Sequence, residues 1–405
     1  MNRYILITIA SLFLSTISLA QNESSIELHS DIGLFNTGID ARTLLNSFTY
    51  IDQEQKDAIL NSLEKNNSFH IDIHNSIHFT SNRFHLSFGN HVSSYGIFDK
   101  NLVNLVLNGN FSSDEINYDL TPLEGNFYHY SDIGLGYDIS EKLTTTLSLI
   151  AGHQFISGDV SEFNFNSDSN GQFVNYDLSL EGYETGNFLE LFENRNDYFE
   201  LNNLNSLFRT NGQGMSLSFD YESILNDIEY SISLSDLGFI KWGSSTNKHS
   251  ISTSQNITPL EIDDFSQIQM SNITNQFDSL RAIRNPMPGA YTFVLPARLN
   301  SSFSKEFLYS RYADSFTFSL EHRFGIYSSP RIAIDLHKSI KKHEFIYGYH
   351  LGGLEKNGLQ FKYNYKADCI HLQLFTRQAS IFDLNSMYGV NVGVGIKFLF
   401  ANKDQ

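Results

Sequence analysis

The stretch YGVNVGVGIKFLF, residues 388–400, alternates between two kinds of side chain. One face is apolar, and the other carries mostly glycine, asparagine and lysine, with Leu399 as the exception. Soluble antiparallel sheets also alternate, but their strands average about 5–6 residues. A run of this length is nearer the ~9–11 residues with which a tilted strand crosses a bilayer. We therefore expect lipid to contact one face of this strand, formed by Val390, Val392, Val394, Ile396 and Phe398.

The same alternation recurs along the chain. Clear examples lie at 132–139, 143–149, 214–221, 228–235 and 315–324. Counting such segments predicts an all-β fold, a transmembrane antiparallel β-barrel of about 14 strands, within a range of about 12–16. Tight connections near 80–83, 140–142 and 223–227 alternate with long polar segments at 158–210 and 241–296. Short periplasmic turns and long extracellular loops are typical of outer-membrane barrels.

The N-terminus predicts export. Arg3 precedes an apolar run from Tyr4 to about Ile17, and small residues follow up to Ala20. This pattern indicates a signal peptide over 1–20, although a membrane anchor with an unusually short apolar run is the alternative. We expect a single barrel domain over 21–405 in the cell outer membrane, inserted by the barrel-assembly machinery and in contact with lipid and lipopolysaccharide. Phe400 is followed by five further residues, which departs from the usual terminal aromatic of such barrels.

Composition excludes several classes of protein. No later stretch approaches 18 consecutive apolar residues, so a helical membrane protein is excluded. The net charge of −18 argues against nucleic-acid binding. The single Cys369 permits neither an internal disulfide nor a cysteine-based metal motif.

One segment differs from the strand pattern. DQEQKDAILNSLEK, residues 52–65, predicts the one short helix, because Asp52 and Gln55 have capping-box spacing. This helix either belongs to an external loop or plugs the lumen.

Several stretches resemble a known family. LSFGNHVSSYGIFDKNLVNLVLNGN (86–110), YDISEKLTTTLSLIAG (137–152), SISLSDLGFIKWG (231–243) and LPARLNSSFSKEF (295–307) are similar to an uncharacterised Bacteroidota family of outer-membrane β-barrels, a domain of unknown function. Its members are related in architecture to FadL-type transporters. The resemblance implies the fold, its most specific part is 235–242, and it transfers no catalytic or binding residue.

The hairpin at 69–91 carries the best candidate site. His70, Asp72, His74, His78 and His85 are expected to face the lumen. A turn centred on Ser81 and Asn82 would place His78 opposite His85, about 4.5–5.5 Å apart between Cβ atoms. Such imidazoles could bind a transition metal or respond to pH, or simply form a polar lining.

A second candidate is the stretch 166–177. Asn166, Asp168, Asn170 and Asp177 approximate the spacing of a calcium loop, but Asp177 replaces the usual glutamate and no helices flank it. An exposed polar loop is the alternative. Glu190, Glu193, Asp197, Glu200, Asp263 and Asp264 make the long loops acidic, which suits solvation, a cationic partner or divalent bridging to lipopolysaccharide.

No catalytic motif is present, and the sequence predicts no enzyme and no cofactor. Two functions remain open. The first is a channel or transporter for small or hydrophobic molecules. The second is a non-conducting barrel that serves as a scaffold or accessory in secretion or surface-protein assembly, with a partner bound through its long loops.

Overall fold

A computed structural model describes residues 24–40, 42, 52–110, 115–169, 173–185, 209–243, 245–257, 287–307, 311–326, 329–354, 357–377 and 387–400. The expected signal peptide at 1–20, Asn170 and the acidic residues at 190–200 and 263–264 lie outside the described residues. No helix among these residues is long and apolar enough to cross a membrane.

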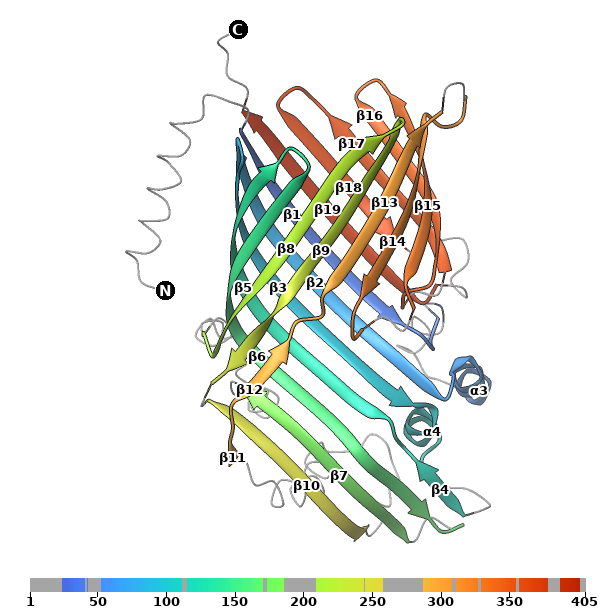
Figure 1. The fold of residues 1–405 in the computed structure, drawn as a ribbon. Helices are drawn as coiled ribbons and strands as arrows, with labels where there is room; N and C mark the ends of the chain where they lie inside the picture. The colour runs from blue at the N-terminus through green and yellow to red at the C-terminus, as the bar shows by residue number, and fades with distance from the viewer. Residues whose placement is uncertain are drawn as a thin grey trace, which may run out of the picture.

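The described chain forms a closed antiparallel barrel of 14 strands (Figure 1). Each strand pairs with the next around the barrel, and β1 closes it against β19, with Ile32 opposite Val392. The expected all-β barrel is confirmed. The barrel strands are β1 (Ser24–Asn36), β2 (Asn66–Ser81), β3 (Phe84–Asp99), β5 (Leu123–Ser140), β6 (Leu143–Ser167), β8 (Gly212–Leu225), β9 (Ile228–Trp242), β13 (Arg298–Glu306), β14 (Ser315–Arg323), β15 (Arg331–Ile340), β16 (His343–Leu351), β17 (Asn357–Lys366), β18 (Ile370–Arg377) and β19 (Gly389–Phe400).

The two ends of the barrel differ. The turn end carries two-residue hairpins whose residues Asn82, Asn226, Asp227 and Lys341 have positive φ, as type I′-like turns require. β1 begins and β19 ends there (Figure 1). The opposite end, called the loop end below, carries most of the longer connections.

A small sheet extends the wall at the loop end. β6 is 25 residues long and pairs with β8 over its first part and with β7 (Val174–Thr185) over its second. β10 (Thr246–Ile257) continues this sheet beside β7. Figure 1 shows β7 and β10 reaching past the barrel strands. Short strands complete it: β4 (Ile116–Asp119) beside β6, β11 (Met287–Pro288) beside β10, and β12 (Tyr291–Val294) beside β9.

Within the described residues, a second helix accompanies the expected one at the loop end. α3 (Gln53–Ser62) confirms the predicted helix, and Asp52 and Gln55 form the capping box. α4 (Lys100–Asn108) follows β3, is capped by Asp99, and packs against α3 (Figure 1). The sequence did not mark this second helix, because its valines and asparagines have weak helix propensity.

The outer face of the barrel is apolar. Val392, Val394 and Phe398 of β19 are exposed, and Ile396 lies in the same row between Leu28 and Leu372. Val390, opposite Leu34, continues the row. Similar exposed apolar side chains occur on other strands, among them Leu135 and Leu149. This arrangement turns a continuous apolar surface outward, and the polar side chains inward.

Candidate functional site: the charged lumen

Strand alternation directs polar side chains into the barrel, where those of the described residues line two cavities. The larger, of 720 Å³, lies toward β13–β19, and the smaller, of 480 Å³, lies toward β3–β9. β1 and β2 border both. The residues that line both cavities are Asp31, Asp72, His74, Ser76, His78, Arg298 and Arg323. These shared side chains stand between the two halves of the lumen.

An ion pair crosses the lumen at this boundary. Arg323 Nη1 of β14 donates to Asp72 Oδ2 of β2 at 3.0 Å. β2 is the second and β14 the ninth of the fourteen barrel strands, so the two side chains come from opposite walls. Arg298 Nη2 lies 3.7 Å from the same carboxylate, and Arg323 Nη2 donates to the Tyr128 hydroxyl at 3.2 Å. We call Asp72 and Arg323 the crossing pair, and Arg298 lies beside it.

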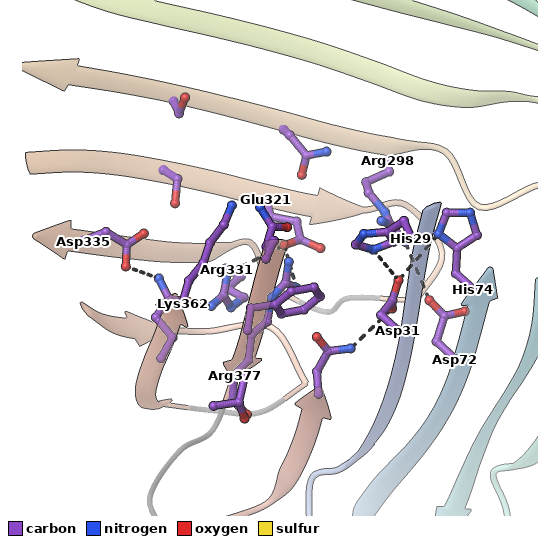
Figure 2. Close-up of a pocket in the computed structure, with 18 of the residues that line it drawn as sticks. His29, Asp31, Asp72, His74, Arg298, Glu321, Arg331, Asp335, Lys362 and Arg377 are labelled. Atoms are coloured by element: carbon purple, nitrogen blue, oxygen red, sulfur yellow. Dashed lines mark hydrogen bonds and ion pairs between the residues drawn. The ribbon is translucent and has the colours of Figure 1, made fainter. Parts of the chain in front are cut away.

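A second ionic group adjoins the larger cavity. Glu321 of β14 accepts from Arg377 at 3.1 Å and lies 3.7 Å from Arg331. Arg331 in turn donates to Gln360, which donates to Asp335 (Figure 2). Glu321 and Arg331 are both buried. The wall of the larger cavity is therefore held by paired charges, which burial requires.

A group of imidazoles and carboxylates occupies the adjoining faces of β1, β2 and β3. His29 Nε2 lies 3.1 Å and His74 Nδ1 3.6 Å from Asp31 Oδ2. The His74 ring stacks on His91, with ring centroids 4.4 Å apart, and His91 Nε2 lies 3.0 Å from Asp132.

An aromatic cluster fills the interior near the loop end. Phe155 and Trp242 are fully buried and stacked, with ring centroids 5.3 Å apart. The other buried members are Tyr128, Tyr130, Ile150, Ile240 and Leu295. Because Tyr128 and Tyr130 also line the smaller cavity, the cluster closes that cavity on one side.

A model of the family of unknown function DUF5723 matches residues 9–343. The chain belongs to that family. The predicted resemblance to a barrel family of unknown function is thereby confirmed. No curated protein matches the sequence.

Solved structures of barrels are similar over nearly the whole chain, at low identity. The toluene transporter TodX of Pseudomonas putida is 10% identical with a TM-score of 0.39, over 96% of this chain and 92% of that chain. The translocator domain of autotransporter NalP from Neisseria meningitidis is 7% identical with a TM-score of 0.30, over 98% and 96%.

The five residues of the predicted lumen-facing polar cluster all line the cavities. His70, Asp72, His74 and His78 border the larger cavity and His85 the smaller. The predicted pairing of His78 with His85 was wrong. The hairpin turns at Asn82 and Arg83, so that His78 faces Ser87 and His85 faces Thr80. Asn82 accounts for the shift, since asparagine tolerates the positive φ of 53° that this turn requires.

Sequence reasoning missed the partners of these residues. The sequence indicated only weakly that His29 and Asp31 face the lumen, because Ser30 interrupts the apolar face of β1. Arg298 and Arg323 were missed because nothing local relates them to Asp72. Arginine at an inward position of a strand is the signal that could have identified both.

The calcium-like stretch folds as a hairpin. Asn166 lies on β6 opposite Asn175, and Asp177 lies on β7 opposite Asn164. Asp168 accepts from the Phe173 backbone N–H at 3.0 Å within the connection. A calcium site there stays a prediction.

Proposed function

We propose that this chain is an outer-membrane channel or transporter for small polar solutes, and that the crossing pair gates it. The outward apolar face supports a membrane location, because a closed barrel satisfies every backbone group within hydrocarbon. The polar lining of both cavities supports a polar solute rather than the hydrophobic one that the family resemblance had left open.

One observation supports the hypothesis that the crossing pair is a gate. Asp72 and Arg323 join opposite walls at 3.0 Å, between cavities of 720 and 480 Å³. These side chains border both cavities, so a solute that passes from one cavity to the other passes directly beside them. Rings of charged side chains are common determinants of selectivity in channels.

Single-channel conductance in planar bilayers tests the proposal. The double variant Asp72→Asn/Arg323→Gln removes both charges of the 3.0 Å ion pair and shortens the arginine side chain, while Arg298 keeps its charge. We expect it to conduct severalfold more than the wild-type barrel.

An exposed ion pair supplies the matched control. Lys342 Nζ and Asp368 Oδ1 also lie 3.0 Å apart, but at the turn end and outside both cavities. The variant Lys342→Gln/Asp368→Asn should conduct as the wild type does. Equal conductance of all three proteins would contradict the gate, and no conductance in any of them would contradict a channel.

The extended sheet favours a second candidate function. β6, β7 and β10 reach beyond the barrel and offer a surface that a conducting pore does not need (Figure 1). A scaffold or accessory in secretion or surface-protein assembly would use it. Cross-linking in whole cells that captures one surface protein, together with a silent barrel in bilayers, would support this alternative.

A further inference from the structure

We propose that His29, Asp31 and His74 bind a divalent transition-metal ion, such as Zn²⁺, inside the lumen. The inference goes beyond the proposed function and does not depend on it, because an ion could be held in a conducting or in a closed barrel.

Adjacent strands bring the three ligands together. His29 and Asp31 are two residues apart on β1, so both point into the lumen. His74 stands directly opposite Asp31 on β2. The antiparallel register therefore fixes the triad through the backbone, and Figure 2 shows both imidazoles directed at the Asp31 carboxylate.

The spacing suits one ion. The ligand atoms of all three residues lie within 4.8 Å of one another, with His29 Nε2 at 3.1 Å and His74 Nδ1 at 3.6 Å from Asp31 Oδ2. In a tetrahedral site with bonds of about 2.0–2.1 Å, ligand atoms lie roughly 3.3 Å apart. Small side-chain rotations would bring the three atoms to that separation.

The donor set selects the class of metal. Two imidazole nitrogens and one carboxylate oxygen suit zinc and other first-row transition ions. Calcium and magnesium prefer oxygen ligands and would bind poorly. The side chains retain exposed fractions of 23%, 17% and 30%, and all three border the larger cavity, so an ion could keep water on its remaining positions.

Neighbouring residues orient the ligands. Asn391 Nδ2 of β19 donates to the other oxygen of Asp31, Oδ1, at 3.5 Å. The His29 ring stacks on Phe375, with centroids 5.8 Å apart, and the His74 ring stacks on His91. Such outer contacts restrict ligand orientation and raise metal affinity.

Metal titration of the full-length chain, purified in detergent without a histidine tag, tests the proposal. Zn²⁺ is added in competition with a chromophoric chelator, and Co²⁺ absorption reports the coordination. We expect one equivalent to bind. His74→Gln should weaken binding by at least roughly 100-fold, because loss of a residue that only supports a metal ligand already costs up to about that much, and His74 is itself a ligand. Asp31→Asn, which preserves side-chain size, should weaken binding similarly.

His78→Gln is the matched control, since His78 borders the same cavity on the same strand but contacts Ser76 instead of the triad. It should bind as the wild type does. Heat-modifiable migration in gels confirms that each variant is folded. Absent stoichiometric binding, equal loss in His78→Gln, or displacement of Co²⁺ by excess Ca²⁺ would each overturn the proposal.

Discussion

Trp242 occupies a space that only glycine neighbours leave open. It is the one tryptophan in the sequence, and its ring is fully buried. A Cβ atom added at Gly152 or at Gly212 would lie 2.6 Å from the ring, well inside van der Waals contact. The two glycines on β6 and β8 therefore allow the aromatic cluster to fill the loop end of the lumen.

Adding a methyl group at Gly152 should destabilise the barrel. We expect Gly152→Ala to lower the free energy of unfolding by about 1–3 kcal/mol, because the Trp242 ring and Ile240 must move. Urea unfolding followed by Trp242 fluorescence measures this. Gly158→Ala on the same strand is the control, since an added Cβ there meets nothing within 4 Å. Equal losses in the two variants would refute the close packing.

At the level of elements, β9 changes which of its residues face inward. Asp236 has a φ of 61°, and the pairing with β8 shifts between Leu217 and Phe219. Before this bulge Ile232 is exposed, whereas after it Leu237 and Phe239 are exposed while Ile240 and Trp242 are buried. The bulge explains why apolar and polar residues do not alternate regularly over 235–242, the stretch that most specifically resembles the family.

The positive φ of Asp236 makes the bulge sensitive to a β-branched residue. Asp236→Val should lower the unfolding free energy by about 1–3 kcal/mol, since such residues strongly disfavour that conformation. Asp236→Gly removes the same charge but accepts the conformation, so we expect it to retain most of the stability. Urea midpoints compare the two variants. If the glycine variant is as unstable as the valine variant, the carboxylate rather than the backbone is responsible.

Local signals predicted most elements but not their finer geometry. Alternation identified the barrel strands, and the Asp52–Gln55 capping box identified α3. α4 has no capping box: Asp99 accepts from the Asn101 backbone N–H and Gly109 is the C-cap. Its core of valine, leucine and asparagine resembles a strand. The turn at Asn82 shifted the hairpin pairing by one position on each strand, because asparagine and arginine form the two-residue turn.

At the scale of the whole molecule, contacts across the lumen could not be predicted. Asp72 and Arg323 are 251 residues apart, and they meet only because the barrel closes with a particular number and stagger of strands. The alternation of apolar and polar residues predicts which side chains point inward, but not which of them face one another across the lumen. The candidate metal triad is easier to predict than the crossing pair, since His74 and Asp31 become neighbours as soon as β1 pairs with β2.

The outward apolar face should not tolerate a charged side chain if it contacts lipid. Val394 lies near the middle of β19 and is exposed, beside Leu374 of β18. Val394→Arg should lower the unfolding free energy in lipid vesicles by about 2–4 kcal/mol, the cost of arginine near the bilayer midplane. Gln373→Arg on β18 places the same charge in the polar lumen, where water can solvate it, and should cost far less. Equal losses, or a barrel that stays dissolved without detergent, would mean that this face does not contact lipid.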